Sequence, residues 1–296
     1  MPLPMNQRKN QMMNHDDFAA FILTHGRPDK VHTYKALRRH GYTGRIVIII
    51  DNEDATSDEY LKRFKDELYV FKKSEVAKHT DTGDNQESRR GVIYARNACH
   101  DIAKELGLKH FIELDDDYAG FSHRYDSSGN YVDKRLRNLD AVWSAMLEFL
   151  MNTPTFSIAM SQSGDYIMGK HGSFWHKPKR KCMNSFICAT DRPFKFYGRI
   201  NEDLTASVDI GSRGGIFLTI PMVALTQKQT QQQAGGLTEL YLDLGTYVKS
   251  FYSVIYQPSC VSVSVLDGGV NPRIHHQVTW KNAVPKIISE RFKKAA

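Results

Sequence analysis

The stretch HFIELDDDYAG, residues 110–120, joins a strand-like segment to three consecutive acids. Phe111–Leu114 has the length and the apolar side chains of a buried β-strand, so Asp115, Asp116 and Asp117 stand where that strand surfaces. Adjacent carboxylates repel one another, and apolar walls increase that cost. The sequence therefore predicts a positive charge close to these acids.

The length and composition of the chain are typical of a soluble globular protein. It has 296 residues, 41% hydrophobic and 25% charged, with a net charge of +7. That basic excess favours a polyanionic partner such as nucleic acid, a nucleotide or an anionic membrane surface, without choosing among them. The four cysteines form no CxxC pair, which argues against structural zinc, and the size of the chain argues against a disulfide framework. The chain shows neither a membrane-length apolar run nor a secretory signal, so we expect a cytoplasmic protein.

Apolar runs alternate with helical periodicities, which indicates a single α/β domain. We expect residues 1–16 to form a flexible tail, residues 17–296 to form the domain, and the glutamine-rich residues 226–236 to be mobile. The expected strands are residues 18–23, 46–50, 111–114, 155–161, 185–190 and 260–265. The expected helices end at Gly41, lie within 86–106, 133–151 and 238–255, begin at Asn201, and follow Pro285.

Polar signals follow three of the expected strands. They are Thr24–Arg27, Asp51–Asn52 and the three acids, and ligands bind at the carboxyl ends of strands in open α/β sheets. Because side chains alternate along an extended segment, Asp115 and Asp117 face the same side, where they suit Mg²⁺ or Mn²⁺. A metal bridging a nucleotide diphosphate would supply the missing charge; the alternative is a solvated acidic turn. Arg96, on the preceding helix, either contacts the nucleotide or is simply solvated.

Two further segments carry chemistry-bearing residues. In NEDL, Asn201 is a good N-cap, and Glu202 and Asp203 favour the helix dipole. The functional alternative is that Asp203 acts as a general base. Near the end of the chain, His275 and His276 are either surface residues or a late metal ligand that touches the diphosphate.

Taken in order, these motifs resemble the GT-A fold glycosyltransferases, which use nucleotide-sugar donors. The resemblance runs from THGRP after the first strand through Asp51, ARNAC, the three acids and the ED helix start to a late histidine, covering about residues 18–276. It implies a Rossmann-like α/β fold with a mixed central sheet flanked by helices.

Longer motifs resemble a subgroup of that fold. FIELDDDY, KRKCMNSFICA, GRINEDLTASVDIGSRGGIFLTI and TQKQTQQQAGG look like the glycosyltransferases associated with TET/JBP-type base dioxygenases, including the base J glucosyltransferase and phage relatives. This resemblance implies metal-dependent transfer of a sugar from a UDP-sugar to a 5-hydroxymethylpyrimidine in DNA. A single well-placed base favours inversion at the anomeric carbon, and retention stays open as the alternative. The setting would be the cytoplasm of a phage-infected cell, or a eukaryotic nucleus.

The resemblance also assigns roles by position. The metal ligands are Asp115 and Asp117 with His275 or His276, and the catalytic base is Asp203, with Glu202 as the alternative. The donor would be held by Thr24, Arg27, Asp51, Arg96, Asp115 and Asp116. The basic loop 169–181 has the composition to contact phosphates and stack on a base. The expected acceptor residues are Trp175, Arg180, Lys181, Asn184 and Arg213.

Three rival functions remain open at this stage. A nucleotidyltransferase would need a triphosphate donor, and the chain contains no glycine-rich phosphate loop or P-loop. A DNA-binding protein with a degenerate site would bind DNA without metal or nucleotide-sugar. A GT-A enzyme could also use a non-DNA acceptor. The sequence favours no particular sugar, base or oligomeric state.

Overall fold

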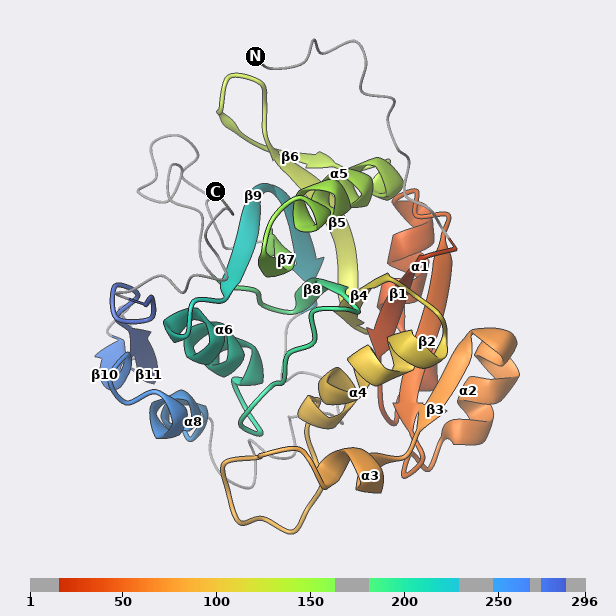
Figure 1. Ribbon diagram of the computed structural model, residues 1–296. Coiled ribbons are helices and arrows are strands. Elements are labelled where there is room, and N and C mark those ends of the chain that lie inside the picture. Colours follow the sequence, from red (N-terminus) through yellow and green to blue (C-terminus); the bar gives the residue numbers. More distant parts are fainter. Residues whose placement is uncertain (1–15, 163–180, 229–246, 267–272, 286–296) are drawn as a thin grey trace, which may run out of the picture.

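The computed structural model describes residues 16–162, 181–228, 247–266 and 273–285. Its centre is a nine-stranded mixed sheet with the strand order β3-β2-β1-β4-β8-β7-β9-β5-β6, and β10 and β11 form a separate antiparallel pair (Figure 1). The strands are β1 (Phe18–Leu23), β2 (Arg45–Asp51), β3 (Leu68–Phe71), β4 (His110–Asp115), β5 (Tyr118–Tyr125), β6 (Tyr131–Arg135), β7 (Thr155–Gln162), β8 (Ser185–Ala189), β9 (Ile216–Gln227), β10 (Val261–Leu266) and β11 (Arg273–Val278).

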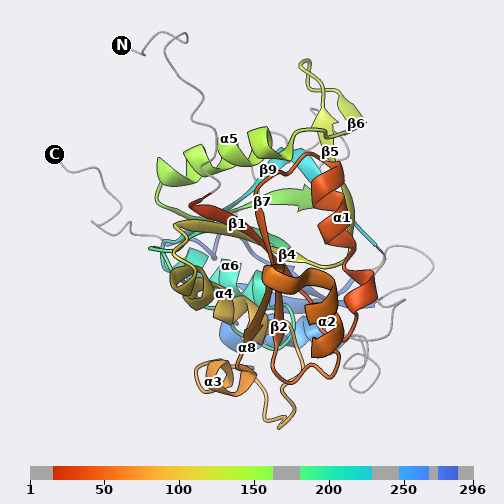
Figure 2. The ribbon, with the colours of Figure 1, turned by 90° about the vertical axis from the view of Figure 1, so that its right-hand side faces the viewer.

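Helices cover both faces of the large sheet. One core contains side chains of α1, α2 and α5, and the other contains side chains of α4 and α6, so α5 and α4 lie on opposite sides of the strands (Figure 2). The helices are α1 (His32–Arg39), α2 (Ser57–Phe64), α3 (Lys73–Ala77), α4 (Ile93–Glu105), α5 (Leu139–Met151), α6 (Glu202–Ser212) and α8 (Lys249–Tyr256), with short 3₁₀ turns η2 (Pro28–Lys30) and η3 (Lys65–Glu67). None of the described helices is long and apolar enough to cross a membrane.

The parallel half of the sheet brings the predicted strand ends together. β1 pairs in parallel with both β2 and β4, and each of its residues is buried because helices cover both faces. In this register Leu23 lies beside Asp115, and β2 ends at Asp51 on the other side. The mixed α/β sheet flanked by helices confirms the predicted fold class. It places Thr24, Asp51 and the three acids together at the carboxyl ends of neighbouring parallel strands.

Two predicted helices are shorter than expected. The helix expected from Asp133 begins only at Leu139, because Tyr131–Arg135 pairs with β5 as an edge strand. The helix expected within 86–106 begins at Ile93. The expected helix after Pro285, residues 1–15 of the tail and most of the glutamine-rich segment lie outside the described residues, so those expectations stay predictions.

The described segment 78–92, between α3 and α4, contains neither helix nor strand, and the buried side chain of Arg199 makes several of the contacts that hold it. Arg199 is 0% exposed and donates two 2.8 Å hydrogen bonds to the carboxylate of Asp84. It also donates to the carbonyls of Ser88, at 2.5 Å, and Arg90, at 2.7 Å. The hydroxyl of Tyr252 on α8 donates to the same carboxylate at 2.6 Å. The segment that leads into α4 is therefore tied to the C-terminal part of the chain.

Candidate active site

The middle acid of the triplet is bound by the end of β1. Asp116 lies in the turn between β4 and β5 and is buried. Its Oδ2 accepts hydrogen bonds from Thr24 Oγ1 at 2.6 Å and from Arg27 Nε at 2.7 Å. Burial raises the pKa of Asp116, and the charge of Arg27 opposes that rise. Arg27 therefore supplies part of the positive charge that the sequence predicts.

The third acid, Asp117, has a polar partner without a charge. Its Oδ2 accepts a hydrogen bond from Gln227 Nε2 at 3.1 Å, and Gln227 Oε1 accepts one from Asn184 Nδ2 at 3.0 Å. Its Oδ1 is buried and has no hydrogen-bond partner among the described residues. Burial and the neighbouring charge of Asp115 raise the pKa of Asp117 to about 7. The predicted acceptor residue Asn184 is thus connected to the acid triplet.

Arg96 on α4 joins three carboxylates from two segments of the chain, β4 and the start of α6. Its Nη2 lies 3.0 Å from Asp115, its Nε lies 2.9 Å from Glu202, and its Nη1 lies 3.6 Å from Glu113. The guanidinium also stacks near the rings of Phe186 and Phe196. Its side chain is only 2% exposed. Arg96 is placed to hold these carboxylates together rather than to be solvated, and it offers little surface for direct contact with a nucleotide.

Glu202 and Asp203 open α6 and are both buried. Burial raises the pKa of Glu202 to about 7 despite the charge of Arg96. Burial also raises the pKa of Asp203, while the charges of Arg96 and Lys181 lower it. Asp203 Oδ1 accepts a 2.7 Å hydrogen bond from the backbone of Leu204. Because Arg96 pairs with both Glu202 and Asp115, the start of α6 lies beside the acid triplet.

The prediction that Asn201 caps α6 is wrong. Its backbone is left-handed, with φ 57°, and its side chain makes no capping hydrogen bond. Instead Nδ2 donates to the carbonyl of Lys249 at 2.6 Å and lies 3.1 Å from His276 Nδ1. Burial and the charges of His275 and Lys181 lower the pKa of His276 to about 4, so its imidazole is neutral at pH 7. Asn201 thus connects the start of α6 to β11 rather than to its own helix.

Asp51, at the end of β2, contacts His25 and Lys73, which were not among the predicted site residues. Asp51 Oδ2 lies 2.9 Å from His25 Nδ1 and 3.2 Å from Lys73 Nζ. His25 also lies 3.5 Å from Asp54, and its side chain is 47% exposed. The hydrogen bond with Asp51 raises the pKa of His25. Its position inside the THGRP motif was the available signal.

A family model described as TET-Associated Glycosyltransferase matches residues 18–236. The chain belongs to this family. The match confirms the predicted resemblance and the enzyme class, and it extends over the acid triplet, Arg96, Glu202 and Asp203. No curated protein matches the chain.

Solved glycosyltransferase structures are similar to the chain at low identity. A mannosyltransferase from Pyrobaculum calidifontis has a TM-score of 0.47 at 9% identity, covering 82% of this chain and 63% of its own. TarS from S. aureus has a TM-score of 0.43 at 10% identity, covering 73% of this chain and 37% of its own. A glucosyl-3-phosphoglycerate synthase from Mycobacterium tuberculosis has a TM-score of 0.41 at 8% identity, covering 88% of this chain and 86% of its own. The chain thus spans less than two thirds of the first two structures.

The predicted metal ligands do not form a preassembled group among the described residues. The described residues contain no group of three or more His, Cys, Asp or Glu side chains able to hold a metal ion. Asp115 and Asp117 repel each other, and Asp117 Oδ1 is buried without a partner among described groups. Two such carboxylates fit Mg²⁺ or Mn²⁺ when a diphosphate and water supply the other oxygens. Neither His275 nor His276 joins them in such a group.

The predicted acceptor residues of this glycosyltransferase are dispersed. The charge of Lys181 acts on Asp203, so it lies near the carboxylates. Arg213 lies away from the carboxylates, because it follows the C-terminal end of α6 and pairs with Asp209 at 2.9 Å. Ten residues of helix put it about 15 Å from Asp203. Trp175 and Arg180 lie outside the described residues.

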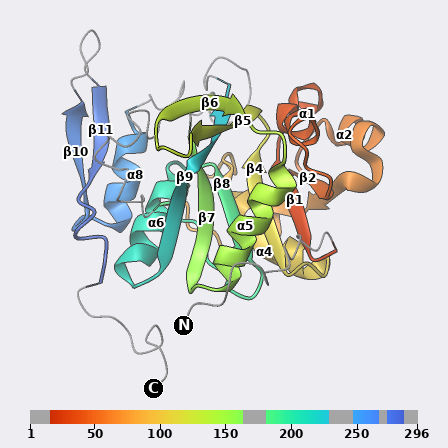
Figure 3. The ribbon, with the colours of Figure 1, turned by 90° about the horizontal axis from the view of Figure 1, so that it is seen from above.

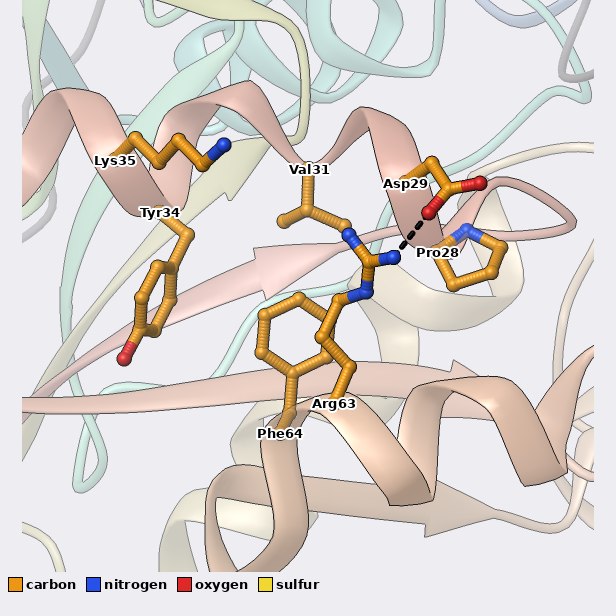
Figure 4. A pocket seen from close by; sticks show the side chains of 7 residues that line it. All are labelled: Pro28, Asp29, Val31, Tyr34, Lys35, Arg63 and Phe64. Carbon is orange, nitrogen blue, oxygen red and sulfur yellow. Dashed lines mark hydrogen bonds and ion pairs between the residues drawn. The ribbon is translucent and has the colours of Figure 1, made fainter.

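One cavity of about 190 Å³ lies apart from the acids, between α1 and α2 (Figure 4). It contains an ion pair between Arg63 and Asp29. Its lining consists of Pro28, Asp29, Val31, Tyr34, Lys35, Arg63 and Phe64. No carboxylate of the triplet reaches it, so we place the active site at the strand ends rather than here.

Proposed function

We propose that this protein transfers a sugar from a UDP-sugar to the hydroxyl of a 5-hydroxymethylpyrimidine in DNA, with divalent metal and with inversion. The supporting observation is that Asp115 of the acid triplet and Glu202 of the Glu202–Asp203 pair, from opposite halves of the chain, both pair with the guanidinium of Arg96. Membership of the TET-associated glycosyltransferase family supports the acceptor. The net charge of +7 agrees with a DNA partner.

The donor would lie across the ends of β1, β2 and β4. Thr24, Arg27 and Asp51 are the polar groups there, and we add His25 because its ring is held by Asp51 and half exposed. Asp115 and Asp117 would hold Mn²⁺ or Mg²⁺, which as a Lewis acid stabilises negative charge on a leaving nucleoside diphosphate.

The acceptor hydroxyl needs a base, and the contacts favour Asp203 over Glu202. Glu202 Oε1 is engaged by Arg96 Nε at 2.9 Å, so its carboxylate is held in a structural ion pair. Asp203 carries only a helix backbone hydrogen bond among the described contacts. Its pKa is raised by burial, which makes its carboxylate a better proton acceptor. A single base positioned for the acceptor is what inversion requires.

The test is to incubate DNA containing hydroxymethyluracil or hydroxymethylcytosine with several UDP-sugars and Mn²⁺, and to analyse the nucleosides by mass spectrometry. A mass increase of one sugar on the modified base, abolished by EDTA, is the expected result. Glycosylation of a protein, lipid or small molecule under the same conditions, with the DNA unmodified, would overturn the proposal. UDP calorimetry with and without Mn²⁺ separates it from a degenerate DNA-binding protein, which would show no metal-dependent UDP binding.

The proposed chemistry also sets where the protein works. A DNA acceptor is available in the cytoplasm of a phage-infected cell or in a nucleus. Reaching a hydroxymethyl group in a duplex requires the base to leave the stack, so contacts with the flanking backbone are expected.

A further inference from the structure

A group of exposed cations lies on α1 and on the β6 edge of the sheet. We call it the basic track, and it consists of Lys35, Arg38, Arg39, Lys134, Arg135 and Arg137. Among the described acids only Glu67 lies within ion-pair distance of any of them, at 3.6 Å from Arg38. Surface cations on folded proteins are commonly interspersed with acids. Here six cations have Asp133 on β6 and Glu67 as neighbouring acids, so positive charge is in excess.

The two parts of the basic track are in direct contact. Arg135 Nη2 donates to the backbone carbonyl of Arg39 at 3.0 Å, and Arg39 in turn donates to the carbonyl of Ala119 on β5. Figures 2 and 3 show α1 beside β5 and β6, so helix and edge strand form one surface. The backbone hydrogen bonds fix these guanidiniums without neutralising them.

One end of this surface begins at the acid triplet. Thr33, in the first turn of α1, donates to the carbonyl of Asp115 at 2.6 Å. From Thr33 to Arg39 the helix axis advances about 9 Å. On the same side, Lys228 bonds the carbonyl of Asp117 through its backbone, and its Nζ lies 2.9 Å from His32 Nε2. Lys228 and the first turn of α1 thus connect the acid triplet to the start of the basic track.

The lowered pKa of His32 reflects the positive charge on this surface. Burial lowers its pKa, and the charges of Lys228, Lys35, Lys30 and Arg27 lower it further. A polyanion laid along α1 would relieve this crowding of like charges.

We propose that the basic track binds the phosphodiester backbone of the DNA acceptor, beside the base that enters the active site. This inference rests on the proposed function and names the surface that would hold its substrate. Phosphate contacts position a nucleic acid on a protein without reading its sequence. Arginine and lysine in a row that leads away from the acids provide such contacts, whereas the acids themselves repel phosphate unless a cation intervenes.

The test compares two double variants that change the net charge equally. Lys35→Glu with Lys134→Glu alters exposed track residues that make no hydrogen bond or ion pair with the described residues. Lys104→Glu with Lys195→Glu is the control, because both residues are exposed and lie outside the track. Anisotropy of a short fluorescein-labelled DNA duplex gives affinity as a function of salt, and UDP calorimetry checks the fold and the donor site of each protein.

The track variant is expected to lose one phosphate contact per substitution. The salt slope of log affinity should become shallower by about 0.9 for each lost contact, and affinity at low salt should fall about threefold or more per contact. Its KM for hydroxymethylated DNA should rise, while UDP binding and turnover of a free hydroxymethyl nucleoside stay at the wild-type level. The control variant should retain the wild-type slope.

Each result decides the question. Equal slopes and affinities for the track variant and the wild type would overturn the basic track, even if the wild type glycosylates DNA. An equal loss in both variants would also overturn it, because the effect would then follow net charge alone. Track-specific loss of DNA binding would support it, and a wild-type enzyme that binds DNA there without modifying it would refute only the proposed function.

Discussion

Replacing Asp117 by asparagine should stabilise the metal-free protein while abolishing transfer. Burial and the neighbouring Asp115 raise the pKa of Asp117 from its ordinary value of 3.8 to about 7. The folded state therefore holds a proton that the unfolded chain has released between about pH 4 and pH 7. Stability falls as pH rises through that window, because the native state binds more protons than the unfolded state. Asparagine has no charge to ionise, and its amide oxygen can still accept from Gln227.

The size of the stability change follows from the shift in the pKa of Asp117. Each pH unit corresponds to 1.36 kcal/mol, so a rise of about three gives an upper limit of about 4 kcal/mol at pH 8. The side chain is partly exposed, and solvent screening reduces the figure to about 2 kcal/mol. At pH 5 the wild-type carboxyl is protonated in the folded state but already ionised in the unfolded chain, so part of the effect is present. The expected gain is therefore about 2 kcal/mol at pH 8 and less than about 1 kcal/mol at pH 5.

Urea denaturation in EDTA at both pH values measures this gain. Asp101→Asn, at an exposed residue of α4, is the control and should change stability by less than about 1 kcal/mol. A gain for Asp117→Asn that is absent at pH 8, or equal at the two pH values, would refute the assigned pKa. With UDP and Mn²⁺ present, ligand binding should stabilise the wild type and fail to stabilise the variant.

The remaining predictions concern the carboxylates and Arg96. Asp203→Asn should lower kcat about 10²–10⁴-fold, with UDP affinity by calorimetry unchanged. If Asp203→Asn is active and Glu202→Gln is inactive, the base is Glu202 and not Asp203. Arg96→Met should lower the free energy of unfolding by about 3–5 kcal/mol, because it leaves buried carboxylates unpaired. That loss should be smaller at pH 5 than at pH 9, since burial raises the pKa of Glu113 to about 8, and an equal loss would contradict this account. Asp51→Asn should weaken UDP binding while leaving the thermal transition within a few degrees of wild type.

The predictable part of the fold is the part that carries continuous apolar runs. β1 and β2 are buried on both faces, so their continuous apolar sequences predict both that they are strands and approximately where they begin and end. β6, by contrast, is an exposed edge strand with the composition YVDKR, which has no strand pattern and was merged into the following helix. The strand β9 (Ile216–Gln227) was not predicted from the sequence either. Its pairing with β7 is interrupted by a register shift.

The predictable part of the site is set by chain position, and the unpredictable part by distant contacts. Asp115, Asp51 and Thr24 follow apolar strands, so the sheet alone places them at one edge. The Arg96–Glu202 ion pair joins residues 106 positions apart, and no local pattern reports it. The positive charge that the triplet requires was expected from a metal, yet arginines already neutralise two of the three acids.

The dependence of segment 78–92 on Arg199 has a consequence for synthesis on the ribosome. Arg199 follows Asp84 by 115 residues, so at about 5–20 residues per second it is made roughly 6–23 s later. During that interval the segment lacks the side chain that satisfies its backbone, while β1, β2 and β4 are already available to pair. The emerging N-terminal half should therefore be open to proteolysis between α3 and α4 until the second half arrives. A nascent chain stalled before residue 199 would be cut there, and one stalled after α8 has left the ribosomal tunnel would not.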